Sequence, residues 1–67
     1  MMASPLLRYF AYDHLPAGPL RDTSFNFASL ANLVDETLPD SAEKTVALRK
    51  LLESKDAAVR AALDVKE

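Results

Sequence analysis

Five residues near the N-terminus concentrate the side chains of this chain that could recognise a ligand. Residues 8–12 read RYFAY and place three of the five aromatic residues of the chain beside an arginine. The face of an aromatic ring can stack on a planar base, and a guanidinium can bind a phosphate, as in the recognition of single-stranded or free nucleotides. The alternative is structural, with Phe10 and one tyrosine packed against the rest of the chain. Both can hold at once, and we predict that Phe10 points inward and Tyr12 outward.

Residue types that support catalysis are sparse in the remaining sequence. The single imidazole, His14, lies beside a proline-rich stretch with no nucleophile motif around it. There is no Gly-rich phosphate loop, and two helices do not by themselves form the dry pocket that paired acid–base carboxylates need. The chain has no cysteine, so a disulfide framework or a thiolate metal site is excluded. The sequence therefore predicts a protein that is not an enzyme and uses no cofactor and no metal.

Composition also limits the partners that the chain can have. Its 67 residues carry a formal net charge of −2, from eight Lys and Arg against ten Asp and Glu, so no basic field attracts DNA or RNA. The apolar stretches are short and interrupted by charge, and no basic region leads into an apolar signal segment. We expect neither a nucleic-acid polymer nor a membrane as partner, and a cytoplasmic location.

Four prolines and one glycine divide the chain into three segments within a single domain, residues 1–67. Residues 5–14 are predicted to form an N-terminal arm, either one or two helical turns or an extended strand of chain. Residues 15–22 contain three helix-breaking residues and are predicted to be a loop. A helix is predicted over residues 23–38, because Thr23 or Ser24 can serve as its N-cap and a proline follows it.

A second and longer helix is predicted over residues 41–64. Asp40 or Ser41 is a suitable N-cap, and Glu43 follows Asp40 at the spacing of a capping box. No glycine or proline interrupts the segment after this start, so the helix should continue for about 24 residues.

The apolar residues of both predicted helices recur at helical spacing, which predicts one buried face on each helix. These residues are Phe27, Leu30, Ala31, Val34 and Leu38 in the first helix, and Leu48, Leu51, Leu52, Val59, Ala62 and Leu63 in the second. The connection between the helices is short enough to force an antiparallel αα-hairpin. A domain this small has a marginal core, and without disulfides or a metal it gains stability by self-association. The predicted fold is therefore all-α, an antiparallel two-helix hairpin with a short N-terminal aromatic arm or helix, in a homo-oligomer.

The order of these segments along the chain resembles that in the anti-CBASS sponges and their anti-Thoeris relatives. Those are small phage proteins with a helical hairpin that sequester the cyclic nucleotide signals of bacterial anti-phage defence. The shared pattern is an arginine-Phe-x-Tyr segment, a Pro-rich loop, an apolar helix and a Pro-Asp-Ser-x-Glu-Lys start of a second helix. The matching positions here are Arg8, Phe10, Tyr12, Pro39, Asp40, Ser41, Glu43, Lys44, Ala47, Leu48 and Leu51. Two features of the family are missing: residues 23–38 contain no Lys or Arg, and KDAAVRAAL replaces an end of the second helix that contains tryptophan.

The resemblance implies a compact homo-oligomer, often a hexamer, that acts in the cytoplasm of an infected bacterium. Pockets between protomers would enclose cyclic di- or trinucleotides, or cyclic ADP-ribose isomers, without cleaving them. By this resemblance Tyr12 stacks on a base, and Arg8 and Arg21 face phosphates. Thr23 or Ser24 would donate hydrogen bonds at the N-terminus of the first helix, which is the end of a helix that favours anions.

Two other interpretations of the sequence remain open. The chain could be a non-catalytic adaptor whose arm and exposed apolar surface dock onto a host protein. It could also be a small helical subunit of a larger assembly, because such a subunit would show the same pattern of helices.

Overall fold

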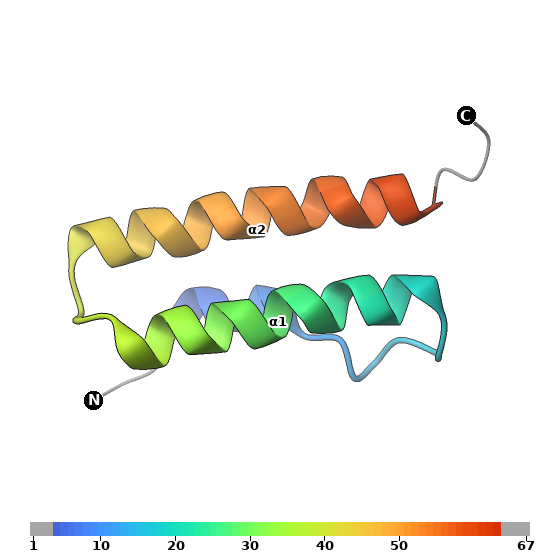
Figure 1. Ribbon diagram of the computed structural model, residues 1–67, viewed down its shortest axis with the longest axis horizontal. Coiled ribbons are helices and arrows are strands. Elements are labelled where there is room, and N and C mark those ends of the chain that lie inside the picture. The colour runs from blue at the N-terminus through green and yellow to red at the C-terminus, as the bar shows by residue number, and fades with distance from the viewer. Residues whose placement is uncertain (1–3, 64–67) are drawn as a thin grey trace.

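The structure is a computed structural model that describes residues 4–63, which form three helices and no strand (Figure 1). A 3₁₀ helix, η1, spans Pro5–Phe10, and two α-helices follow, α1 over Pro19–Thr37 and α2 over Ala42–Leu63. The helices α1 and α2 run antiparallel and side by side, and η1 packs against both of them. The prediction of an all-α hairpin with a short N-terminal helix is therefore confirmed for the single chain. The last residue of the predicted second helix, Asp64, lies outside the described residues.

The helix α1 begins at Pro19 rather than at Thr23. Proline has no N–H to donate and a fixed φ, so it suits the first turn of a helix, where the N–H groups have no partner within the helix. Gly18 precedes it as the N-cap with a φ of +146°, a conformation that favours glycine. The predicted loop over residues 15–22 is therefore shorter, and the predicted N-cap role of Thr23 and Ser24 is wrong. Both residues lie in the second turn of α1.

The start of α2 follows the prediction more closely. The Oγ atom of Ser41 accepts a hydrogen bond from the backbone N–H of Lys44 at 3.1 Å, which makes Ser41 the N-cap. The carboxylate of Asp40 instead accepts from the side chain of Lys44, with Nζ at 2.8 Å. The helix then continues without interruption for 22 residues.

The core is small and lies where the three helices meet. Its buried apolar residues are Phe10, Ala28, Ala31 and Leu48, and the partly buried residues packed against them are Leu6, Leu7, Tyr12, Phe27, Val34, Leu51 and Leu52. The side chain of Phe10 is only 2% exposed, which confirms that it points inward. Because α1 contributes two alanines to this core, the larger residues Phe10 and Leu48 fill most of the space between the helices.

The buried face of α1 agrees with the predicted one in part, because Ala31 is buried and Phe27 and Val34 pack against the core. The residues that α1 buries are Ser24, Ala28, Ala31 and Asp35, whereas the predicted core residues Leu30 and Leu38 remain 46% and 43% exposed. The apolar arc of α1 is wider than the surface that α2 and η1 can cover, and two polar residues occupy part of the covered side. Leu30 and Leu33, three positions apart on the same side of α1, are exposed on the outside of the hairpin, and Leu38 is exposed just after the helix.

A buried lysine explains why Asp35 can lie on the covered side. Lys44 Nζ lies 3.2 Å from Asp35 Oδ1 and 2.8 Å from Asp40 Oδ1. It also donates to the backbone oxygens of Asp35 at 2.7 Å and Leu38 at 3.3 Å. One ammonium group thus pairs with two carboxylates and satisfies carbonyl groups at the C-terminal end of α1.

These ion pairs predict a loss of stability at alkaline pH. The hydrogen bond with Asp40 is the main cause that raises the pKa of Lys44 above 10.5; partial desolvation opposes it, and Asp35 adds to it. Because the pKa in the folded state is raised, this stabilisation is fully present below pH 10.5 and is lost as the pH rises through the folded pKa. We expect Tm, followed by circular dichroism, to fall above that pH.

The control for this prediction is the Asp35→Leu/Lys44→Met double variant, which lacks the titrating pair but keeps side chains of similar size. Its Tm should fall less over the same pH range, because the ammonium group with the raised pKa is absent. An equal fall in both proteins would contradict the assigned role of Lys44.

Candidate functional site

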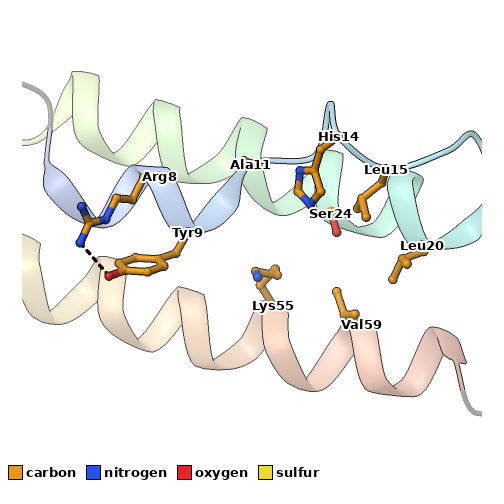
Figure 2. Close-up of a pocket in the computed structure, with 9 residues that line it drawn as sticks. All are labelled: Arg8, Tyr9, Ala11, His14, Leu15, Leu20, Ser24, Lys55 and Val59. Atoms are coloured by element: carbon orange, nitrogen blue, oxygen red, sulfur yellow. Dashed lines mark hydrogen bonds between the residues drawn. The ribbon is translucent and has the colours of Figure 1, made fainter.

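A hollow of about 260 Å³ lies between η1, the loop after it, the first half of α1 and the second half of α2 (Figure 2). Its lining residues are Arg8, Tyr9, Ala11, His14, Leu15, Leu20, Ser24, Lys55 and Val59. Three of these residues, Arg8, His14 and Lys55, have basic side chains, and none of the lining residues is acidic. The hollow therefore combines an apolar lining with basic groups in a chain whose net charge is −2.

Arg8 and Tyr9 form one side of the hollow. The guanidinium of Arg8 donates a hydrogen bond from Nη2 to Tyr9 Oη at 2.9 Å, and its Cζ lies 4.9 Å from the centroid of the tyrosine ring. The Tyr9 side chain is 49% exposed. A guanidinium held against a ring keeps further N–H donors for a phosphate, and an exposed ring can stack on a base.

Lys55, His14 and Ser24 face the same space from three different elements. Figure 2 shows the His14 ring extending from the loop and the Lys55 side chain extending from α2, with Ser24 of α1 between them in this view. Lys55 Nζ lies 3.0 Å from Asp56 Oδ1, an ion pair with an exposed carboxylate. The Asp56 side chain is 51% exposed, so water screens this pair and an anionic ligand could replace the carboxylate.

The predicted ligand-binding residues fall into two groups. Arg8 and Ser24 line the hollow. Tyr12 and Arg21 lie in a separate cluster with Phe25: the rings of Tyr12 and Phe25 meet edge to face with centroids 5.0 Å apart, and Arg21 Cζ lies 5.9 Å from the Tyr12 centroid. Tyr12 is thus half-buried and packed on its neighbours rather than fully outward.

The fifth predicted residue, Thr23, is partly buried on α1 and is not among the residues that line the hollow. Its expected hydrogen bond to an anion depended on a position at the helix N-terminus. Because α1 begins at Pro19, the N-terminus of the helix is formed by residues that precede Thr23 in the chain.

The structure adds Tyr9, His14 and Lys55 to the residues that sequence reasoning selected. No sequence signal selects Tyr9. Residues three apart in a 3₁₀ helix lie on the same side, which fits the packing of Leu7 and Phe10 on the core. Leu6 also packs there, whereas Tyr9, three positions after it, is 49% exposed. His14 was noted only as an unsuitable catalytic base, and Lys55 gave no signal, since it comes close to η1 only through the packing of α2.

Two further observations bear on the chemistry that the described residues allow. Across residues 4–63, no group of three or more His, Cys, Asp or Glu side chains is placed to hold a metal ion. Neither long helix in this part of the chain has an apolar run sufficient to cross a membrane.

Comparisons of the chain with protein-family models, with curated proteins and with solved structures found no match. A function for this protein must therefore be argued from the geometry of the hollow and from the sequence pattern.

Proposed function

We propose that this protein binds cyclic oligonucleotides, or cyclic ADP-ribose isomers, without cleaving them, and thereby inhibits the bacterial anti-phage defence that they activate. The observation that carries the proposal is the stacking of Arg8 on the exposed ring of Tyr9 at the edge of a hollow that also contains Lys55. A cyclic nucleotide presents phosphates and flat bases together, so it requires cationic donors and ring faces together. The sequence pattern that resembles the phage sponges supports the same ligand class.

The size of the hollow favours a site that a second copy of the chain completes. Sites for drug-sized ligands enclose about 300 to 1,000 Å³, whereas this hollow has about 260 Å³. A cyclic dinucleotide would therefore extend beyond one chain. Large apolar side chains lie exposed on the same molecule, namely Phe25, Leu30, Leu33, Leu38 and Leu63. These support the proposal of a homo-oligomer, a hexamer by the resemblance, with ligand sites between protomers.

Self-association is expected in solution at micromolar concentration. Light scattering should give a mass several times that of the 7.4 kDa chain. Leu33→Glu should lower this mass with no loss of helix, because it places a charge on the apolar outer surface of α1. Ser54→Glu, which places the same charge at an exposed position on α2, is the control that should keep the assembly. A stable wild-type monomer would contradict this prediction.

Tyr12 provides a test of the base-stacking role that the resemblance assigns. Its ring packs with Phe25 and Arg21 outside the hollow, so Tyr12 can stack only on a ligand that extends beyond the hollow. Tyr12→Ala should weaken binding by about 1 to 3 kcal/mol, roughly fivefold to 150-fold, while the oligomer persists. Tyr12→Phe keeps the ring and should retain the affinity. Calorimetric titration measures both variants, and unchanged affinity in Tyr12→Ala would remove Tyr12 from the site.

The experiment that tests the proposed function is a thermal shift with a ligand panel. The panel contains cyclic di-AMP, cyclic di-GMP, cyclic GMP–AMP, cyclic triadenylate and isomers of cyclic ADP-ribose. A ligand that binds the folded state alone must raise Tm. Arg8→Ala and Lys55→Ala should reduce the shift, because each removes a phosphate-binding charge from the hollow.

Lys50→Ala is the matched control for the two charge variants. Lys50 also lies on α2, but its side chain is 68% exposed and does not line the hollow. Its loss should leave the ligand-induced shift intact. An equal reduction in Lys50→Ala would show that the ligand responds to net charge rather than to the hollow.

The exposed apolar surface of α1 also favours the second candidate, a non-catalytic adaptor that docks onto a host protein. An adaptor would show no thermal shift with any member of the panel. The two candidates are therefore separated by the same experiment.

A further inference from the structure

One carboxylate oxygen joins all three helices at the end of the hairpin that is far from the hollow. Asp35 Oδ1 accepts a hydrogen bond from the backbone N–H of Ser4 at 3.2 Å and lies 3.2 Å from Lys44 Nζ. Asp35 and Lys44 are both buried. The chain entering η1, the last turns of α1 and the first turn of α2 are thus held at a single point.

Ser4 controls how η1 begins. Its Oγ accepts from the N–H of Leu6 at 3.3 Å, and its carbonyl oxygen accepts from the N–H of Leu7 at 3.1 Å, so it is the N-cap of η1. The next residues of η1 are Arg8 and Tyr9, which reach the hollow. A fixed position for Ser4 therefore fixes the start of the short helix that presents these two side chains.

The other contacts that hold η1 are apolar. Leu6, Leu7 and Phe10 pack on the core, and such contacts are not directional. Within the described part of the chain, the bond from Ser4 to Asp35 is the one side-chain hydrogen bond between residues 4–10 and the hairpin. A hydrogen bond to a buried charged group is directional and stronger than one between neutral groups. It can therefore fix the rotation of η1 about its own axis, which apolar packing alone does not determine.

We propose that the Asp35–Lys44 pair is a positioning device for η1. Lys44 holds the Asp35 carboxylate in place, the carboxylate fixes Ser4, and Ser4 sets the register in which Arg8 and Tyr9 meet the hollow. Setting a register is the best-attested way in which buried polar or ionic groups give conformational specificity. The part of this proposal that concerns ligand affinity rests on the proposed function.

Two substitutions at Ser4 separate the hydrogen bond from the cap. Ser4→Pro removes the N–H, and the native φ of −64° and ψ of 136° suit a proline followed by Pro5. Ser4→Ala keeps the N–H, and both variants lose the hydroxyl. In hydrogen exchange, the amides of residues 7–10 should exchange about tenfold faster in Ser4→Pro than in Ser4→Ala, with α2 amides unchanged. Equal exchange of residues 7–10 in the two variants would overturn the proposal.

The Asp35→Leu/Lys44→Met double variant tests the pair itself. Replacing a buried pair with apolar residues of similar size often preserves a fold, so α1 and α2 should stay protected while residues 7–10 again exchange about tenfold faster than in the wild type. Wild-type protection of residues 7–10 in this variant would overturn the proposal. Loss of protection throughout α1 and α2 would also overturn it, because the pair would then support the hairpin as a whole.

Ligand binding supplies the last readout. Ser4→Pro should bind cyclic di-AMP or cyclic di-GMP, whichever the wild type binds more tightly, about tenfold more weakly than Ser4→Ala. Equal affinity would overturn the positioning of Arg8 and Tyr9 for binding. If the wild type binds neither of these two, the same comparison uses the member of the panel that it binds most tightly. If it binds no member of the panel, the proposed function fails, and the exchange measurements still decide whether the pair positions η1.

Discussion

Phe10→Ala is expected to lower the free energy of unfolding by about 3 to 5 kcal/mol. The side chain is 2% exposed, and Phe10 is the one aromatic residue among the buried residues of the described chain. Its neighbours in the core from α1 are alanines, which cannot extend to fill the space left by the ring. A single core in a chain this short rarely supplies more than about 3 to 5 kcal/mol, so the variant should be largely unfolded.

Urea unfolding followed by circular dichroism measures this effect. Tyr9→Ala is the control, because it removes a neighbouring ring from the exposed side of the same short helix, and its unfolding free energy should change by about 0.5 kcal/mol or less. A fall of less than about 1 kcal/mol in Phe10→Ala would show that η1 is not part of the core.

Leu48→Ala is expected to lower the free energy of unfolding by about 2 to 5 kcal/mol. Leu48 has no exposed surface and is the largest fully buried side chain in the described residues. It is the fully buried apolar residue that α2 contributes, so its loss removes contacts to both η1 and α1. The matched control is Arg49→Ala, one residue further along α2 and exposed, where alanine is equally suited to a helix.

Size-exclusion chromatography measures the assembly of Leu48→Ala and Arg49→Ala, and urea unfolding measures their stability. Leu48→Ala should unfold at a much lower urea concentration and lose the assembly, whereas Arg49→Ala should do neither. Similar behaviour of the two variants would mean that the packing of α2 on the core differs from that described.

The helices could be predicted from local signals in the sequence, and the errors have local physical causes. The end of α1 and the start of α2 follow from Pro39 and from Ser41 as N-cap. The start of α1 was misplaced because proline is common both in loops and at the first position of a helix, and only the conformation of Gly18 decides between them.

Periodicity identified part of the buried face of α1, namely Phe27, Ala31 and Val34, and missed the rest. Counting apolar residues favours the side with Leu30, whereas burial follows the side with Asp35. Asp35 is buried because Lys44, nine positions later on another helix, pairs with it. Such a pairing exists only once the hairpin has closed.

The candidate site was predictable in part. The RYFAY segment led to Arg8, which lines the hollow, but the residues that complete the basic lining come from distant positions. Lys55 in particular looked like any exposed residue of α2, because its ion pair with Asp56 is local. Tyr12 and Arg21 do lie together, yet they meet over Phe25 rather than in the hollow.

The most direct measurement is a calorimetric titration of the wild-type protein with each cyclic nucleotide of the panel, followed by heat release and chromatography of the bound ligand. We predict saturable binding of at least one cyclic nucleotide, and recovery of that ligand in its intact cyclic form. Formation of a linear product at a rate that depends on protein concentration, or the absence of binding by every member of the panel, would contradict non-catalytic sequestration.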